Sequence, residues 1–214
     1  MITRINSVPP PVEEAGSDCL LWRHRENDYK AWFSSKNTWN QIRRQGDTVE
    51  WSKLIWFSHT VPRDSFIAWL AIRNRLSTGD HTQIWGEHQS CRLCGEPNES
   101  RDHLFFVCPY SYTIWTELTS SLLPRPNPDW GITVTMLLSP RRSNTDSCLL
   151  RLSFQAVIHS VWRERNSRKH TGVYRTAQQL TRFIDKTIRN RSSLRYKSAE
   201  KCSALMIRWM GRNE

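Results

Sequence analysis

Three cysteines and one histidine lie close together near the middle of the sequence, with the spacing C-x2-C-x8-H-x4-C: Cys91, Cys94, His103 and Cys108. Zn²⁺ is usually held by four sulfur or nitrogen ligands in a tetrahedron, and C-x2-C is a common first half of such a site. Four protein ligands leave no coordination position open for a substrate. The spacing therefore predicts one structural Zn²⁺ and no catalytic metal.

The residues around these ligands indicate how the chain positions them. Gly95 follows Cys94 and allows a tight turn without a Cβ penalty. The apolar residues 104–107 predict a helical turn that presents His103. Cys108 lies five residues after His103, too far round an ideal α-helix to share its face. Pro109 disfavours the α region for Cys108, so we expect the helix to break there and the thiol to turn back.

The remaining cysteines and the chain start suggest the setting. Cys19, Cys148 and Cys202 have no ligand partner at metal spacing, so we expect small buried hydrophobic residues. The N-terminus has no apolar segment typical of a secretory signal, and no run reaches the roughly 18 apolar residues that cross a bilayer. These features predict an intracellular protein, nuclear or cytoplasmic, with reduced thiols and no membrane partner.

Composition favours a mainly α fold. The 214 residues include 11 Trp but only 8 Gly, which indicates helices joined by short loops. We predict a small helical domain organised around the CCHC zinc knuckle and followed by basic C-terminal helices. The predicted organisation is an extended lead-in (1–18), a zinc-binding domain (19–123, core 51–115), a proline-rich linker with a short helix (124–145) and a basic helical region (146–214).

Apolar periodicity and capping residues predict the individual elements. A hairpin is expected between residues 19 and 33. Helices are expected at 36–45, around 51–56, from Pro62 to about residue 72, from Ser77 or Thr78 to residue 85, from Pro109 to about 122, and at 130–138, 146–169, 176–191 and 198–210. We expect most of the tryptophans to pack in the core.

The positive charge is concentrated in the last third of the chain. Residues 141–214 contain 17 Lys and Arg against 5 Asp and Glu, whereas residues 1–140 contain 14 against 15. Such asymmetry is typical of a segment that contacts a polyanion, although a solvated helix face gives the same pattern. The candidate RNA- or DNA-binding residues end one predicted helix or share a face of the next: Arg163, Arg165, Arg168, Lys169, Arg182, Lys186 and Arg189.

The cysteine cluster with its flanks resembles the reverse transcriptase zinc-binding domain of plant LINE-type (non-LTR) retrotransposon polyproteins. The resemblance runs from about Trp51 to Trp115 and includes Phe66-Ile-Ala-Trp-Leu70, Cys91-x2-Cys94-Gly95, Glu99-Ser-Arg-Asp-His103 and Cys108-Pro-Tyr-Ser111. It extends loosely upstream to residues 29–42 and downstream to residues 151–170. The resemblance implies a zinc-binding module of a family whose proteins often carry a polymerase upstream.

The sequence does not carry the catalytic pattern of a polymerase. Reverse transcription needs paired aspartates to hold two Mg²⁺ ions, and the sequence contains no Asp-Asp dipeptide. A nucleobase deaminase is disfavoured because His24-x-Glu26 lies more than sixty residues from Cys91 and the Pro of its signature is missing. We therefore expect a detached, non-catalytic zinc module that binds RNA or DNA non-specifically. The alternative is a protein-interaction module that docks on a reverse transcriptase or another partner.

Overall fold

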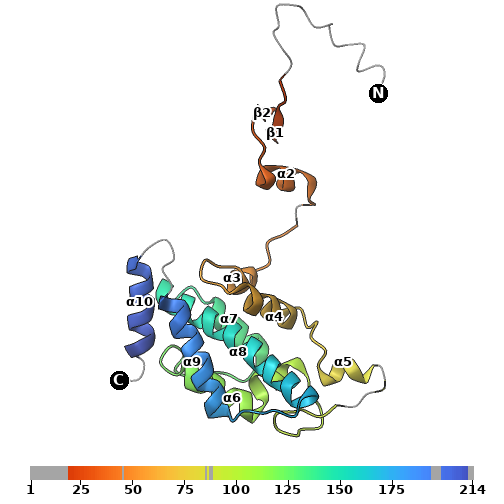
Figure 1. Ribbon diagram of the computed structural model, residues 1–214, viewed down its shortest axis with the longest axis vertical. Coiled ribbons are helices and arrows are strands. Elements are labelled where there is room, and N and C mark those ends of the chain that lie inside the picture. Colours follow the sequence, from red (N-terminus) through yellow and green to blue (C-terminus); the bar gives the residue numbers. More distant parts are fainter. Residues whose placement is uncertain (1–18, 45, 85, 87–88, 194–198, 212–214) are drawn as a thin grey trace, which may run out of the picture. The chain divides into compact units, whose positions relative to one another are not determined.

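The structure is a computed structural model that describes residues 19–44, 46–84, 86, 89–193 and 199–211. The chain divides between residues 48 and 49 into two units, which we describe separately. The predicted lead-in, residues 1–18, lies outside the described residues. The described elements are almost all helical, as predicted, with two short strands (Figure 1). None of the described helices is long and apolar enough to cross a membrane.

The first unit is a hairpin followed by one helix. Strands β1 (Trp22–Arg25) and β2 (Asp28–Lys30) pair antiparallel, and Asn27 adopts a positive φ of 60° in the turn. Helix α2 (Ser35–Ile42) begins at the Ser34 cap, whose hydroxyl accepts the amide N–H of Asn37 at 3.3 Å. The predicted hairpin is confirmed, and the helix predicted over residues 36–45 is present but ends at Ile42.

His24 is the one described residue of this unit with a buried side chain. Its Nε2 lies 2.8 Å from the carbonyl oxygen of Trp32, and its Nδ1 lies 3.0 Å from the amide nitrogen of the Asn37 side chain. Most of the unit's aromatic side chains are exposed instead. The expectation that tryptophans are mostly core is therefore wrong here, because a hairpin and two turns of helix have no interior large enough to bury them.

The second unit is a stack of helices around one hydrophobic core. Its helices are α3 (Ser52–Ile55), α4 (Pro62–Ile72), α5 (Gly79–Gln83), the π-helical turn η2 (His103–Val107), α6 (Pro109–Thr119), α7 (Trp130–Leu138), α8 (Asn144–His170), α9 (Ala177–Ser193) and α10 (Ala199–Met210). Each predicted helix of this unit is present. The helix predicted to extend to Trp85 ends at Gln83, and Trp85 itself lies outside the described residues.

Helix α8 is the centre of this unit. The Ser143 hydroxyl caps it by accepting the amide N–H of Asp146 at 3.0 Å. The helix packs against α4, α6, α7, α9 and α10, and Figure 1 shows it running between α4 and α9. Apolar side chains such as Leu149, Phe154 and Val157 are fully buried on it. The first helix of the predicted basic region, residues 146–214, thus contributes to the core of the second unit.

Aromatic rings fill the middle of that core. Phe106 lies 5.4 Å from both Trp115 and Trp130, measured between ring centroids, and 6.2 Å from Phe154. These rings come from η2, α6, α7 and α8, so four elements meet at Phe106. Since η2 also contains His103, the candidate metal ligands are joined directly to the main core.

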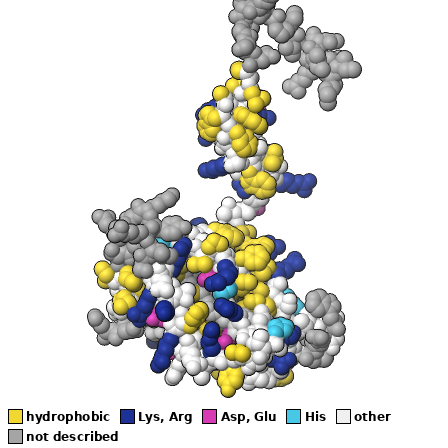
Figure 2. All heavy atoms as spheres, viewed as in Figure 1, with side chains coloured by type: hydrophobic (Ala, Val, Ile, Leu, Met, Phe, Trp, Pro, Cys, Tyr) yellow, Lys and Arg dark blue, Asp and Glu magenta, His cyan; other side chains and the backbone are white. Residues whose placement is uncertain are grey.

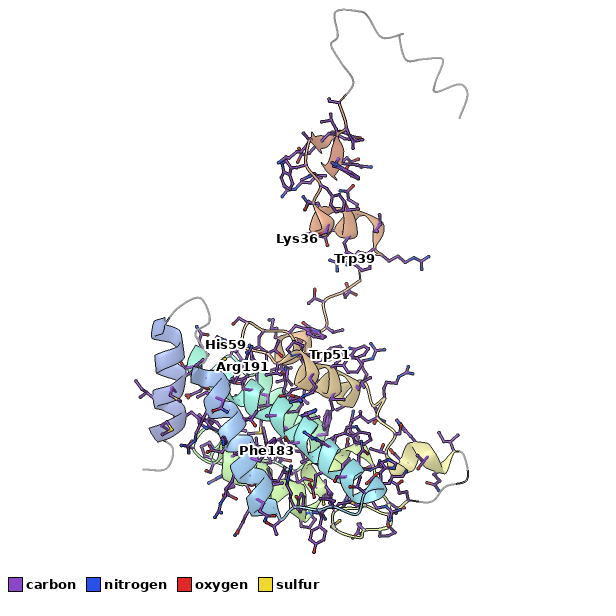
Figure 3. The ribbon with its side chains drawn as sticks, viewed as in Figure 1. Lys36, Trp39, Trp51, His59, Phe183 and Arg191 are labelled. Atoms are coloured by element: carbon purple, nitrogen blue, oxygen red, sulfur yellow. The ribbon has the colours of Figure 1, made fainter. Side chains whose placement is uncertain are left out.

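The far end of α9 is tied to the loop between α3 and α4. The Arg191 guanidinium donates to the carbonyl oxygens of His59 at 2.8 Å and Thr60 at 2.9 Å. Figure 3 shows Arg191 reaching from α9 toward His59. These bonds fix α9 against the loop that leads into α4.

Candidate metal centre

The first two ligands are carried by a tight turn between α5 and η2. The amide N–H of Gly95 donates to the carbonyl oxygen of Cys91 at 2.8 Å, and the amide N–H of Cys91 donates to the carbonyl oxygen of Glu96 at 2.7 Å. Gly95 has φ of +87°, a conformation that a side chain would strain. The glycine that the sequence places after Cys94 is thus needed for the turn that directs both thiols to one point.

The last two ligands are aligned by a π-helical turn. The amide N–H of Cys108 donates to the carbonyl oxygen of His103, five residues earlier, at 2.7 Å. This wider turn brings positions i and i+5 to the same side, which an α-helix does not do. Cys108 has ψ of 126°, outside the helical region, as the following Pro109 requires. The predicted break at Cys108 is confirmed, and the π-turn is the feature that the spacing argument did not include.

The four predicted ligands meet at one point. Their ligand atoms, one from each of Cys91, Cys94, His103 and Cys108, all lie within 4.8 Å of one another. Sγ of Cys91 lies 3.9 Å from Sγ of Cys108, and Sγ of Cys94 lies 3.2 Å from Nε2 of His103. Sulfur ligands placed about 2.3 Å from a tetrahedral Zn²⁺ would be roughly 3.8 Å apart. The Cys3His group therefore has the composition and the size of a structural zinc site.

The electrostatics of the cluster also suit a cation. The hydrogen bond from the Cys91 thiol to Cys108, followed by burial, raises the pKa of Cys91 well above its ordinary value, and the same bond lowers the pKa of Cys108. Burial lowers the pKa of His103, which favours the neutral imidazole that can coordinate a metal. Because Cys91 and Cys108 are buried side by side, a cation is what would allow both thiols to ionise.

A buried ion pair connects the metal-binding loop to α8. Nη2 of Arg165 lies 2.6 Å from Oε1 of Glu99, and the side chains are only 3% and 0% exposed. The Glu99 carboxylate also accepts the amide N–H of Gly79 at 3.1 Å and Nε2 of Gln89 at 3.0 Å. Arg165 in addition donates to the carbonyl oxygen of Ser77 at 3.1 Å. Glu99 and Arg165 thus hold together the start of α5, the segment before Cys91 and the central helix.

Two further side chains of α8 contact the same loop. Nη1 of Arg168 donates to the carbonyl oxygen of Leu93, between the first two ligands, at 3.3 Å, and its guanidinium lies 4.6 Å from the centroid of the Tyr110 ring. Nζ of Lys169 donates to Oε1 of Gln89 at 2.6 Å. The basic end of α8 is therefore directed largely at the metal-binding loop.

This arrangement corrects part of the predicted nucleic-acid-binding set. Arg165 is excluded because its guanidinium is buried and paired with Glu99, and Arg168 and Lys169 are engaged with the metal-binding loop. A basic last turn of a helix is usually expected to face solvent, but the last turn of α8 contacts the metal-binding loop. The structure places the other predicted residues as follows: Arg163, Arg182 and Lys186 are exposed, and Arg189 is partly exposed with Nε 2.6 Å from Asp185.

The structural roles of two site residues could not be predicted from the sequence. Glu99 and Gln89 are both buried, and their basic partners on α8 lie 66 and 80 residues away in the sequence. No local pattern reveals such long-range pairs. The expectation that the three isolated cysteines are buried is partly wrong. Cys19 is exposed and Cys148 is half-buried, while the side chain of Cys202 lies outside the described part.

The start of α5 approaches the metal-binding loop so closely that only glycine fits. A Cβ on Gly79 would lie 2.5 Å from the backbone oxygen of Gln89 and 3.0 Å from Cβ of Glu99. We expect Gly79→Ala to lower the free energy of unfolding by about 1–3 kcal/mol, since backbone must shift to relieve the contact. Urea denaturation measures this. Gly131→Ala on α7 is the matched control, because its Cβ would meet nothing closer than 3.4 Å, and equal stability of the two variants would contradict the prediction.

Comparison with known protein families agrees with this geometry. Residues 33–115 match the family model described as zinc-binding in reverse transcriptase. The match begins just before α2, ends within α6 and contains all four members of the Cys3His group. No curated protein and no solved structure matches the chain. The predicted resemblance to a reverse transcriptase zinc-binding domain is therefore confirmed for this segment, which is an accessory and not a catalytic part of such proteins.

Proposed function

We propose that this chain is a non-catalytic, zinc-stabilised module of LINE-type retrotransposon origin that binds RNA or DNA non-specifically, in the nucleus or the cytoplasm. The observation that carries the proposal is the set of exposed basic side chains on α8 and α9, in a region with 17 Lys and Arg against 5 Asp and Glu. Figure 2 shows Lys and Arg side chains gathered on the face that α8 and α9 form. Contacts of such residues with phosphates give affinity that depends little on sequence.

The acidic groups of the second unit support a binding role over a catalytic one. Its buried carboxylates are each engaged by a basic side chain: Asp64 by His159, Glu99 by Arg165 and Glu164 by Arg168. Among the described residues, the Cys3His group is the only cluster of three or more His, Cys, Asp or Glu close enough to hold a metal ion.

Nucleic-acid binding should respond to salt and to three side chains. Arg163, Arg182 and Lys186 are exposed, so we expect them to neutralise about three phosphates. The logarithm of the affinity should then fall with the logarithm of the salt concentration, with a slope of roughly −2.7 on duplex DNA and −2.1 on single strands. Replacing all three with Gln should flatten most of this slope for every sequence tested. Fluorescence anisotropy over a salt series measures it.

The control for this experiment replaces exposed arginines elsewhere. Arg73→Gln, Arg75→Gln and Arg125→Gln together remove the same charge from other exposed positions. Point variants are preferable to a truncation after Pro140, because such a truncation would remove α8 and with it the core. If the triple variant of Arg163, Arg182 and Lys186 keeps the salt slope of the unaltered chain, these side chains face solvent and do not contact the nucleic acid.

A protein-docking role is the second candidate, and the exposed apolar surface of the first unit favours it. Trp32 is 57% exposed, Trp39 is 59% exposed and Ile42 is 72% exposed. Figure 2 shows hydrophobic side chains over much of this unit. So much exposed apolar surface on a small element is typical of an interaction site. Salt-insensitive capture of a reverse transcriptase fragment, lost in Trp39→Ser, would favour docking over nucleic-acid binding.

A further inference from the structure

A basic pocket lies between α4, α8, α9 and the loop that joins α8 to α9. It is a small, partly open depression, and three arginines line it, Arg63, Arg163 and Arg175, together with His159 and Phe183. Figure 3 shows Phe183 on α9, which packs beside α8. None of these residues belongs to the metal centre, and only Arg163 was singled out from the sequence.

The pocket has more positive charge than its own carboxylate can balance. Asp64 is its acidic residue, and Oδ1 of Asp64 lies 3.3 Å from Nδ1 of His159 and 3.4 Å from Nε of Arg63. Arg163 and Arg175 are both exposed at the mouth of the pocket. Among the described residues, neither has a carboxylate within ion-pair distance. Two guanidinium groups with unused donors therefore flank a pocket whose single carboxylate is already engaged.

Arg175 is held in place before any ligand arrives. Its amide N–H donates to the Glu164 carboxylate at 2.7 Å, and its carbonyl oxygen accepts from Arg168 at 2.8 Å and from the Tyr110 hydroxyl at 3.0 Å. Its guanidinium lies 5.2 Å from the centroid of the Phe183 ring. A backbone fixed from both sides and a side chain resting on an aromatic ring reduce the entropy that binding would cost.

We propose that this pocket binds a backbone phosphate of single-stranded nucleic acid, with Arg163 and Arg175 donating to the phosphate oxygens and Phe183 contacting the adjoining base. The inference rests on the proposed nucleic-acid binding and names its central contact. Guanidinium groups donate in pairs to phosphate oxygens, which suits two exposed arginines that line one pocket. The Phe183 ring is 43% exposed beside them, and exposed rings in basic grooves stack on bases with little regard to sequence.

The test compares two pairs of substitutions in the full, zinc-loaded chain. Arg163→Gln with Arg175→Gln removes the two pocket donors, and Arg125→Gln with Arg141→Gln removes the same charge from exposed positions outside the pocket. The probe is a fluorescein-labelled oligothymidylate of 20 nucleotides in a chloride series. We expect the pocket pair to bind about tenfold more weakly than the control pair, with a salt slope shallower by roughly 0.7, because the two arginines neutralise one phosphate.

Phe183→Leu separates stacking from charge. This variant should keep the salt slope of the unaltered chain and lose about fivefold in affinity, because a base–aromatic contact is removed and no phosphate contact is. Thermal melting and zinc content confirm that each variant is folded. In the unaltered chain, inorganic phosphate should compete with the oligonucleotide when it replaces chloride at constant ionic strength.

The outcomes distinguish this inference from the proposal beneath it. One outcome is that the unaltered chain binds the oligonucleotide while the double variant of the pocket binds it as tightly as the control double variant does. That result would overturn the pocket assignment and leave the proposed nucleic-acid binding intact. Competition by inorganic phosphate in both pairs alike would also overturn it. If the unaltered chain does not bind even at low salt, the proposed function fails and the inference fails with it.

Discussion

Cys91→Ser and Cys108→Ser should each abolish zinc binding and unfold most of the second unit. Purified, reduced protein is expected to contain about one Zn²⁺ per chain, measured by elemental analysis. Apparent binding free energies of structural zinc sites are about 10–16 kcal/mol, as large as the stability of a whole domain. Since Leu104, Phe105 and Phe106 are fully buried beside the ligands, losing the metal should disturb the main core and not only a surface loop. Circular dichroism and thermal melting report this loss.

Cys148→Ser is the matched control for the ligand variants. Cys148 is a half-buried thiol on α8 and lies outside the Cys3His group. This variant should keep the full zinc content and most of the helicity. A chain purified under reducing conditions without zinc, or a Cys108→Ser variant that melts like the unaltered chain, would contradict the structural role of the metal.

The ligands could be predicted from sequence because the information is local. Two cysteines on a tight turn, a histidine on an apolar turn and a cysteine before proline each restrict the backbone within a few residues. The π-turn could not be predicted in the same way. Its hydrogen bond from Cys108 to His103 depends on η2 packing Phe105 and Phe106 into a core that distant helices complete.

Helix positions were also predictable, but their burial was not. Apolar periodicity and caps located α4, α7 and α8 to within a few residues. The hydrophobic pattern of α8 does not reveal that six other α-helices and η2 contact it, nor that Arg165 points inward. A buried arginine has the same local sequence signature as an exposed one. The difference lies in Glu99, which is far away in the sequence and reaches Arg165 only in the folded chain.

Glu99→Ala should destabilise the second unit more than any substitution of an exposed charged residue. It leaves the Arg165 guanidinium buried without its carboxylate, and Gly79 and Gln89 lose their acceptor. Breaking a buried ion pair on one side costs about 3–5 kcal/mol. Arg165→Met should cost a comparable amount, since Glu99 is 0% exposed and would become an unpaired buried anion. Urea denaturation with zinc present measures both.

The double variant separates the ion pair from the other bonds of Glu99. Removing both charges abolishes the unpaired-charge penalty, so Glu99→Ala with Arg165→Met should be less destabilised than the sum of the single variants, by roughly 2–3 kcal/mol. It should remain less stable than the unaltered chain, because the N–H groups of Gly79 and Gln89 still lack an acceptor. Arg189→Gln is the control: its pair with Asp185 is partly exposed and separated by one helical turn, so its loss should cost about 0.5 kcal/mol. Strict additivity of the two single variants would show that Glu99 acts through its bonds to the loop alone, and that α8 does not hold the metal-binding loop through this ion pair.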